Sequence, residues 1–422
     1  MKKVLIITYY WPPAGGPGVQ RVVKFAKYLP QFGWQPVILT VKNPVSPAID
    51  PSLLKSIPKE CIVYKTKALQ PFSFYKAFTG KSKSSNIPKD VITKKEGESF
   101  KDSLARWIRA NFFVPDARIG WIPYIVREGL NIIKKENIQA IFSTSPPHSL
   151  QLGAKKLAAK SKIKWIADFR DPWYEAYWES DIKKSAVSSH LNKYFEKSII
   201  RHCDLFTTVS AGIAETFFEK YKTPYKVLYN GFDEINTREI ETERFNIIFI
   251  GNLSKFQDPG PFLRALSQIP DDIRSQIEIS FIGNVFMDFR PVFNDTGVKM
   301  LDYMPYKELM QFAGKASLLL LIFHETSYSL GYMTAKIFDY LALRKPILAI
   351  GKKNSIGEKV LKETESGELF EANETQSIKD FVLKTFYTWK EKKSILLESN
   401  KNLNLYQTQH NVELLTKLFE AN

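Results

Sequence analysis

The sequence has few cysteines and no long apolar run. Its two cysteines, Cys61 and Cys203, match no metal-binding or redox spacing, which is typical of a reducing compartment. No apolar run approaches the ~18 residues that span a bilayer. The short apolar run at residues 4–7 is better explained as a first strand than as a signal peptide. We therefore expect a cytoplasmic protein that folds around apolar cores.

Acidic residues are scarce in the first half of the chain. Residues 1–235 hold 37 Lys and Arg against 20 Asp and Glu, whereas the remainder holds 23 against 24. This asymmetry suggests an anionic partner for the first half, a membrane surface or nucleic acid, against the alternative of a basic composition with no partner. The stretch SLARWIRANFF at 103–113 predicts a basic amphipathic helix with a Trp, which suits a membrane interface, although it also suits a helix packed on its own domain. We expect the membrane, with the protein peripheral on its inner face, and no nucleic acid.

Short apolar runs alternate with helical patterns along most of the chain. This alternation predicts an α/β protein with parallel sheets, and 422 residues predict two domains. The pattern is interrupted at about residues 67–120, which we interpret as an insertion, and residues 76–101 within it are rich in Lys, Ser and Gly. A charged run at 233–244 predicts the linker. We expect domains at 1–235 and 236–395, followed by a helical tail at 396–422.

The stretch 317–350 predicts a strand, a polar loop, a helix and a second strand. A helix N-terminus at the carboxyl end of a sheet favours anions, because its N–H groups and dipole point there. A lysine at that place suits a diphosphate, and a carboxylate suits ribose hydroxyls. The alternative is a buried unit with no ligand. The loop and the first turns of the helix carry Glu325, Gly331, Thr334, Lys336 and Asp339.

Glycine-rich loops follow the first strand of each half. Gly15 and Gly16 precede a helix whose Arg21 and Lys24 could meet phosphate or be solvated, and the loop is not a dinucleotide fingerprint. In the second half, a strand ends at Gly251, and a helix begins near residue 259, which is a second phosphate-type geometry. The loop after this strand carries Gly251, Asn252 and Lys255, and Gly283 ends the next predicted strand, 277–282.

Two neighbouring strands of the first half end in polar residues. SPPHS ends the first strand with His148, and DFRDPW ends the second with Asp168, Arg170 and Asp171. Open α/β sheets bind ligands at this edge. The alternatives are a structural histidine and an internal ion-pair lock on the second loop. Ser210 is the expected N-cap of a later helix.

GYMTAKIFDYLALRKPILAI resembles the nucleotide-binding element of family-4-type retaining glycosyltransferases of the GT-B fold. In that family two glutamates stand eight positions apart, and they fall here on Gly331 and Asp339. SPPHS and DFRDPW resemble a subset from bacterial surface-polysaccharide (lipopolysaccharide or capsule) synthesis, and VLYNGFD at 227–233 is similar to the domain-junction motif. The resemblance implies two Rossmann-like domains facing a central cleft, with a last helix that packs back on the first domain.

The resemblance also implies the roles of the site residues. The second domain would bind a UDP-, GDP- or other nucleotide sugar, with Glu325 as a substitute for the carboxylate missing at Gly331. The first domain would bind a glycan or lipid-linked acceptor, with catalytic residues His148, Asp168, Arg170 and Asp171. No Asp-x-Asp motif stands where it could bridge a metal to a diphosphate, so we expect retaining transfer with no metal and no cofactor. The alternatives are a nonhydrolysing sugar-nucleotide epimerase of the same fold and a non-catalytic nucleotide-sugar-binding protein.

Overall fold

In the computed structural model, the chain divides into two compact units. The first comprises Met1–Tyr229 and Asn411–Asn422, and the second comprises Asn230–His410. The sequence predicts the domain boundary after residue 235 and the return of the chain to the first domain at residue 396. The structure places these two transitions after residue 229 and at residue 411. The structure describes residues 1–44, 46, 49–69, 107–108, 110–173, 184–235, 238–325, 330–331, 333–398 and 401–421.

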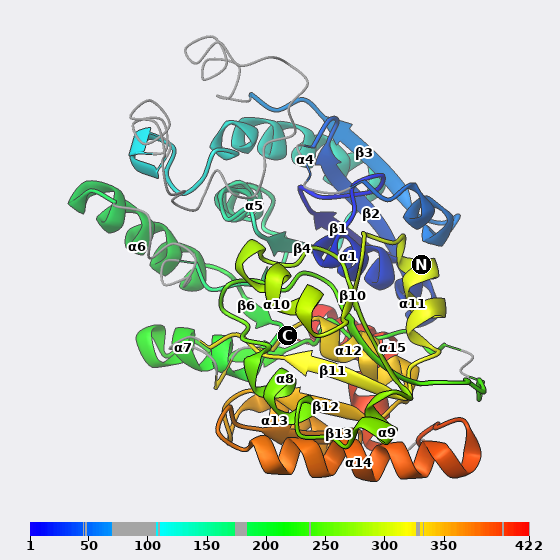
Figure 1. The fold of residues 1–422 in the computed structure, drawn as a ribbon. Helices are drawn as coiled ribbons and strands as arrows, with labels where there is room; N and C mark the ends of the chain where they lie inside the picture. Colours follow the sequence, from blue (N-terminus) through cyan, green and yellow to red (C-terminus); the bar gives the residue numbers. More distant parts are fainter. Residues whose placement is uncertain are drawn as a thin grey trace. The chain divides into compact units, whose positions relative to one another are not determined.

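The first unit is built on a seven-stranded parallel sheet in the order β3-β2-β1-β4-β5-β6-β7 (Figure 1). The chain runs outward from β1 to β3 and then returns to place β4 on the other side of β1. The topological switch point therefore lies between β1 and β4, where open α/β sheets bind ligands at the carboxyl ends of the strands. The strands are β1 Lys2–Ile7, β2 Trp34–Val41, β3 Ile62–Thr66, β4 Ala140–Ser145, β5 Trp165–Phe169, β6 Leu205–Thr208 and β7 Tyr225–Val227.

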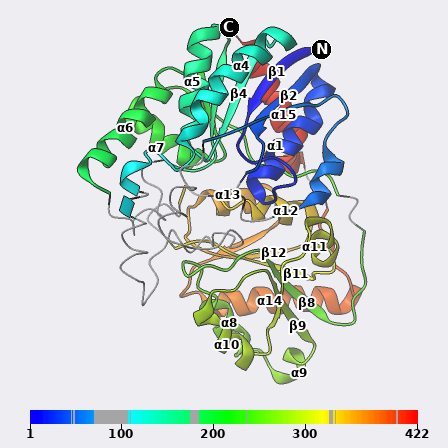
Figure 2. The ribbon, with the colours of Figure 1, turned by 90° about the horizontal axis from the view of Figure 1, so that it is seen from above.

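Alternate residues of β1 supply two separate cores. Leu5 and Ile7 pack in the cluster that includes residues of α4 and α5, whereas Val4 and Ile6 pack in the cluster that includes residues of α1 and α15 (Figure 2). A strand buried on both faces needs this continuous apolar run. Ser210 caps α7 by accepting a hydrogen bond from the Ile213 N–H, which confirms the predicted cap. The helices are α1 Pro17–Tyr28, α4 Ile122–Glu136, α5 Ser149–Ser161, α6 Ala186–Ile200, α7 Ala211–Tyr221 and α15 Thr408–Glu420.

The end of the chain belongs to the core of the first unit. Val412, Leu415 and Phe419 of α15 lie in the same cluster as Val4, and the Phe419 ring lies 4.9 Å from the Trp34 ring. The buried Asn411 side chain accepts a hydrogen bond from the Tyr229 N–H at 2.8 Å. These contacts attach the last residues of the chain to the first sheet.

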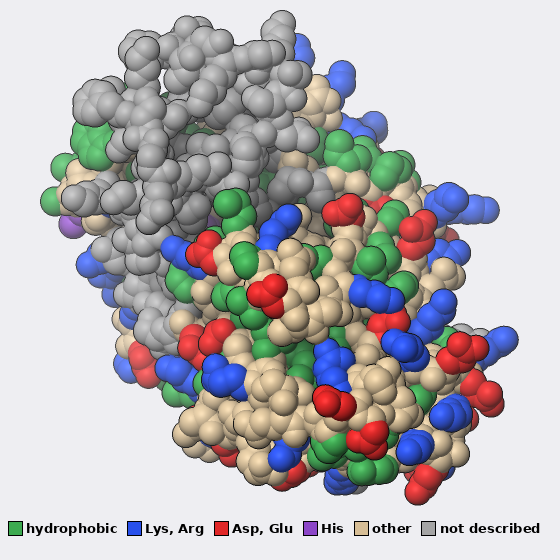
Figure 3. Space-filling view, in the orientation of Figure 1, with side chains coloured by type: hydrophobic (Ala, Val, Ile, Leu, Met, Phe, Trp, Pro, Cys, Tyr) green, Lys and Arg blue, Asp and Glu red, His purple; other side chains and the backbone are tan. Residues whose placement is uncertain are grey.

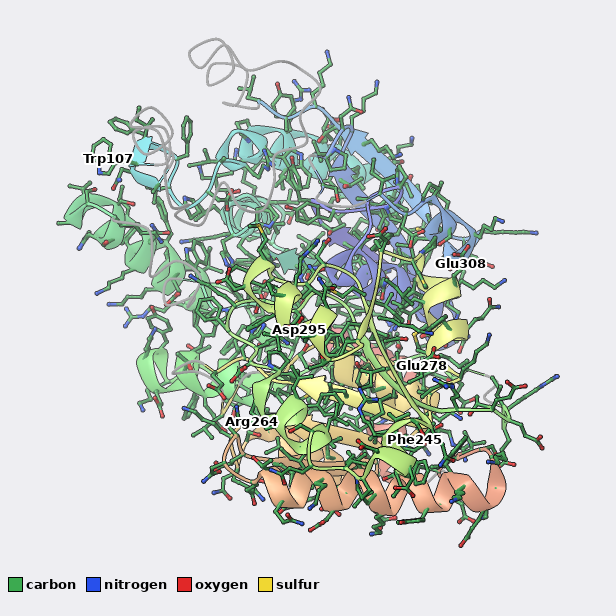
Figure 4. The ribbon with its side chains drawn as sticks, viewed as in Figure 1. Trp107, Phe245, Arg264, Glu278, Asp295 and Glu308 are labelled. Atoms are coloured by element: carbon green, nitrogen blue, oxygen red, sulfur yellow. The ribbon has the colours of Figure 1, made fainter. Side chains whose placement is uncertain are left out.

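The second unit is built on a six-stranded parallel sheet in the order β10-β9-β8-β11-β12-β13, with its switch point between β8 and β11. Phe245, at the start of β8 and labelled in Figure 4, packs against Phe386 and Trp389 of α14. The strands are β8 Phe245–Ile250, β9 Ile277–Ile282, β10 Lys299–Leu301, β11 Leu318–Ile322, β12 Ile347–Ile350 and β13 Gly367–Phe370. The helices are α8 Gly260–Leu266, α9 Asp271–Arg274, α10 Arg290–Asp295, α11 Tyr306–Ala313, α12 Lys336–Leu343, α13 Ile356–Glu363 and α14 Thr375–Lys392.

Candidate functional site

Asp168 is an internal anion at the carboxyl edge of the first sheet. Its side chain is fully buried, and its two oxygens accept hydrogen bonds from Arg21 (Nη2 at 2.9 Å and Nε at 3.3 Å). Thr144 Oγ1 donates to it at 2.6 Å and Thr207 Oγ1 at 2.9 Å. The Asp168 carboxylate on β5 therefore links α1, β4 and β6. It forms an internal ion pair, as in the alternative considered from the sequence, but its partner is Arg21 and not Arg170.

The expectation that Arg21 meets phosphate or solvent is wrong. Its side chain is 2% exposed, and besides Asp168 it donates to the Tyr229 carbonyl at 2.8 Å. The sequence analysis did not single out Thr144 or Thr207. A signal was available, because each is a polar residue at the carboxyl end of a buried apolar strand, in the same place as Asp168 on β5.

Arg170 links the start of α1 to the end of β4 and the loop after it by hydrogen bonds. Its guanidinium donates to the carbonyls of Ser145 (3.1 Å), Gly18 (2.7 Å) and Pro146 (2.8 Å). A Cβ at Gly18 would lie 2.5 Å from Arg170 Nη1, so a glycine is needed there for the close approach. Arg170 thus connects the first turn of α1 to the proline loop after β4. Burial raises the pKa of the neighbouring Asp171.

Gly15 is buried, and Gly16 is the N-cap of α1. At Gly16 φ is 102°, in the region that favours glycine, although a Cβ there would touch nothing within 4 Å. The backbone conformation, rather than space, requires the glycine. Both predicted glycines therefore lie directly before the first turn of α1, which Arg170 contacts.

His148 lies at the start of α5, half-buried against an aromatic ring. Its imidazole stacks on Trp173 with centroids 4.7 Å apart and planes 10° apart, and Nδ1 lies 3.2 Å from Ser145 Oγ. Burial, followed by the charge of Arg170, lowers the pKa of His148 to about 3. The imidazole is therefore neutral at physiological pH, and it can orient a hydroxyl by a hydrogen bond without carrying a charge.

In the second unit, the predicted glycines and Lys336 come together at the switch point. Gly251 follows β8 with φ +89°, and a Cβ on it would lie 2.8 Å from Lys336 Cε. Gly283 follows β9 with φ +117°, and a Cβ on it would lie 3.0 Å from the Gly251 carbonyl group. The two glycines thus leave the space that the lysine side chain occupies, as a close backbone approach requires.

Lys336 is the first residue of α12, and its ammonium lies over the edge of the sheet. Nζ donates to the Asn252 carbonyl at 2.9 Å and lies 4.1 Å from the centre of the Phe249 ring. Burial lowers its pKa to about 7. An ammonium has three donors, so this group can serve a bound anion in addition to Asn252.

The backbone at the start of α12 offers fewer donors than the sequence suggests. The N–H groups of Ile337 and Phe338 already donate to the carbonyls of Thr334 (3.3 Å) and Ala335 (3.2 Å). The helix begins at Lys336, two residues after Thr334, which the sequence places near the helix start. Positive charge at this site therefore comes chiefly from the lysine side chain.

Asp339 follows one turn after Lys336 and is held by a tyrosine. Tyr306 Oη, at the start of α11, donates to Asp339 Oδ1 at 2.8 Å. Burial and the charge of Asp339 raise the pKa of Tyr306 above its usual value, so the hydroxyl stays protonated. No signal in the sequence pointed to Tyr306, because its contact with Asp339 depends on how α11 packs beside α12.

The other predicted donor residues lie around this centre. The Glu325 N–H donates to the Phe256 carbonyl at 2.8 Å, which brings residue 325 to the loop of Lys255, and both side chains are exposed. His324 faces Lys336, and burial together with that cation lowers the pKa of His324 to about 4. Gly331 is half-buried, and its neighbours 326–329 and 332 lie outside the described residues.

Tyr340 bridges the two central strands of this sheet where they separate. Its hydroxyl donates to the Leu320 carbonyl at 2.9 Å and accepts from the Ile250 N–H at 3.0 Å. No pattern in the sequence pointed to this role of Tyr340. The hydroxyl satisfies two backbone groups that lie beyond the last paired residues of β8 and β11, Ile248 and Leu319.

Tyr340→Phe is therefore expected to lower the free energy of unfolding by about 1–3 kcal/mol, because it leaves two buried backbone groups without a partner. Urea unfolding would measure the loss. The same substitution at Tyr387, which is 52% exposed on α14, should change nothing. Equal stability of the two variants would contradict the bridging role.

The described residues include neither a cluster of metal ligands nor a membrane-spanning helix. Among these residues, no group of three or more His, Cys, Asp or Glu could hold a metal ion. None of the helices in the described part of the chain has the length and apolar composition to cross a bilayer.

Comparisons with known proteins match both the sequence and the fold. A model of Glycosyltransferase Family 4 matches residues 16–234, more than half of the chain. Anabaena HepE in complex with UDP superposes with a TM-score of 0.59 at 13% identity, over 100% of both chains. The lipopolysaccharide outer core galactosyltransferase WaaB superposes with a TM-score of 0.57 at 12% identity, over 99% of this chain and 100% of WaaB.

A third solved structure is a putative UDP-N-acetylglucosamine 2-epimerase from Listeria monocytogenes. It superposes with a TM-score of 0.54 at 8% identity, over 100% of this chain and 98% of the epimerase. No curated protein sequence matches the chain significantly. At these identities the structural likeness shows the fold alone, which is GT-B, with two Rossmann-like parallel-sheet domains.

Proposed function

The chain belongs to Glycosyltransferase Family 4 and is a glycosyltransferase of the GT-B type, and from this premise we propose that it transfers a hexosyl group from a nucleotide diphosphate sugar to a glycan or lipid-linked acceptor. The second unit holds the donor and the first holds the acceptor. The transfer retains the anomeric configuration and uses no metal ion.

One observation supports this proposal most directly: Gly251, Gly283 and Lys336 lie together at the switch point of the second sheet. When the glycosidic bond to the diphosphate breaks, negative charge develops on the leaving phosphate oxygen. An ammonium already in place stabilises that charge without reorganisation. Asp339, fixed by Tyr306, lies one turn further along α12 and can accept hydrogen bonds from ribose hydroxyls.

The nucleotide base and the sugar are to be found by experiment. A thermal-shift screen over UDP-, GDP-, ADP- and dTDP-sugars selects the donor, because a ligand that binds only the folded state raises its stability. Transfer of a labelled sugar from that donor to a membrane or glycan extract then tests the reaction. Conversion of the donor to an epimer without acceptor would favour the epimerase, whose fold the Listeria protein shares. Binding without turnover would favour the non-catalytic alternative.

His148→Ala is expected to lower the transfer rate about fivefold while leaving nucleotide affinity unchanged, since His148 belongs to the first unit and the loss of one orienting hydrogen bond is worth about 1 kcal/mol. Initial rates and calorimetry on the same preparations measure both quantities. The matched control is His202→Ala, because His202 is exposed and lies outside the carboxyl edge of the sheet. Weakened nucleotide binding in His148→Ala would contradict its assignment to the acceptor side.

The proposal includes a peripheral location on the inner face of the plasma membrane. An acceptor attached to a lipid stays at the bilayer, and the excess of 37 basic over 20 acidic residues in 1–235 suits an anionic surface. The domain that takes the acceptor is thus also the one that carries the charge.

A further inference from the structure

The solvent-facing side of α6 carries an apolar stripe. Val187 is 69% exposed, Leu191 36% and Tyr194 59%. Their spacings of four and three residues place them on one line along the helix. In Figure 1 this helix extends at the left of the first sheet, and Figure 3 shows hydrophobic, histidine and Lys or Arg side chains side by side along the same edge.

The inward side of α6 is unusually polar. Ser188, Asn192 and Glu196 recur every four residues and are at most 2% exposed. Asn192 accepts a hydrogen bond from Trp173 Nε1 at 3.0 Å, and Glu196 accepts one from Tyr221 Oη at 2.6 Å. A helix in water normally turns its apolar side inward. The first three turns of α6 reverse this arrangement, whereas Ile199 and Ile200 at its end join the core.

A basic stripe runs beside the apolar one. His190, Lys193 and Lys197 are exposed and spaced by three and four residues. The acidic residue of this helix, Glu196, is 2% exposed. The basic residues also line a surface groove between α6 and α7, with Tyr194, Glu196, Lys220 and Tyr221.

Residues 110–112 lie beside the start of α6. Asn111 Oδ1 accepts a hydrogen bond from the Ser185 N–H at 2.6 Å, and the Ala110 carbonyl accepts one from Ser188 Oγ at 2.9 Å. Trp107, labelled in Figure 4, is 45% exposed and Phe112 is 71% exposed. Of the interfacial helix predicted at 103–113, residues Leu104, Arg106 and Arg109 lie outside the described residues.

We propose that Trp107, Phe112, Val187, Leu191 and Tyr194, with the basic stripe of α6, form the surface by which this protein lies on an anionic bilayer. Interfacial helices have this pattern, in which apolar and aromatic side chains enter the headgroup boundary and cations beside them meet lipid phosphates. The inference deepens the peripheral location proposed above, and it does not depend on the transfer chemistry.

The observations favour a bilayer over a second copy of the chain. In a two-fold dimer through this surface, the basic stripe of one copy would face that of the other, because symmetric interfaces bring the same patch together. Trp and Tyr are also the side chains that prefer a membrane interface, since each has an apolar ring and a polar group.

Flotation of the full chain with vesicles tests the inference. The protein should float with vesicles made of equal parts of phosphatidylglycerol and phosphatidylcholine at low salt, stay behind with phosphatidylcholine alone, and be released at high salt. Leu191→Asn with Tyr194→Ser should weaken vesicle binding about tenfold, and Lys193→Gln with Lys197→Gln should remove most of its salt dependence. Tyr387→Ser, an equally exposed tyrosine of the second unit, is the control and should bind like the wild type.

A second measurement does not depend on weakened variants. A polarity-sensitive dye on Tyr194→Cys should shift to shorter wavelength when anionic vesicles are added, whereas the same dye on Tyr387→Cys should not. Burial raises the pKa of both native thiols to about 12, so they compete little for the dye.

Several results would overturn the inference. These are the absence of flotation at low salt, wild-type binding by the Leu191 and Tyr194 variant together with an unshifted dye, and self-association in sedimentation that the α6 substitutions abolish. The outcome is separable from the proposed function. A protein that floats as expected but transfers no sugar to either a membrane extract or a glycan extract would refute the transferase proposal and leave the α6 surface intact.

Discussion

Asp168→Ala should destabilise the first unit by about 3–5 kcal/mol, the usual effect of removing one partner of a buried ion pair. The substitution leaves the Arg21 guanidinium buried beside the space of the lost carboxylate, and it removes the acceptor of Thr144 and Thr207. Urea unfolding followed by tryptophan fluorescence measures the loss, with Trp165 of β5 as a reporter in the same sheet.

Two further variants separate charge from shape in this prediction. Asp168→Asn keeps the shape and loses the charge, so its loss should be smaller. Combining Asp168→Ala with Arg21→Met should cost less than the sum of the two changes, because no unpaired charge remains. The exposed pair of Lys417 and Glu413 provides the control, since Lys417→Ala should leave stability nearly unchanged. A stable Asp168→Ala protein that has lost transfer activity would instead support the catalytic role that the sequence suggested.

Lys336→Ala should weaken binding of a nucleoside diphosphate sugar about tenfold to a hundredfold, since a hydrogen bond to a charged group contributes ~1.5–3 kcal/mol. The binding should also depend on pH. Burial holds the pKa of Lys336 at about 7 in the free protein, and a bound diphosphate raises it by favouring the ammonium. Affinity should therefore be highest below pH 7 and fall by up to about tenfold per pH unit above it.

Calorimetry between pH 6 and 9 measures this dependence. The probe is the nucleotide sugar that gives the largest thermal shift, because a diphosphate esterified at both ends does not titrate in this range. His324, whose pKa is lowered to about 4, stays neutral throughout. Lys336→Arg should bind with no pH dependence, since guanidinium remains charged, and Lys336→Met should bind weakly at every pH. Wild-type affinity in Lys336→Met would show that the nucleotide does not bind at α12.

Most of the fold was predictable because its signals are local. Apolar runs such as those of β1 and β11 can bury both faces only in a parallel sheet, and the runs between them have helical spacing. The positions of Gly251, Gly283 and Lys336 were predictable for a related reason, since each stands at a strand end or helix start. Parallel strands bring such ends to one edge whatever the details of packing.

The partners of the site residues were not predictable from spacing. Asp168 finds Arg21, which is 147 positions away, and Asp339 finds Tyr306, which is 33 positions away. Neither pair could be predicted from periodicity, because each depends on how two elements from distant parts of the sequence pack together. The burial of charged side chains could not be predicted from the sequence either. Arg21 and Asp168 look like solvent-facing or ligand-facing charges until the sheet and α1 enclose them.

The membership of residues 411–422 in the first unit affects how the protein folds during synthesis. Ribosomes add roughly 5–20 residues per second, so the segment 230–410 takes about 10–40 s to follow the first 229 residues. Throughout that interval the face of the first sheet formed by Val4 and Ile6 lacks the side chains of Val412, Leu415 and Phe419. The nascent first unit therefore exposes an apolar surface that chaperones can bind. Ribosome stalling or a premature stop near the end of the message damages the domain that was made first.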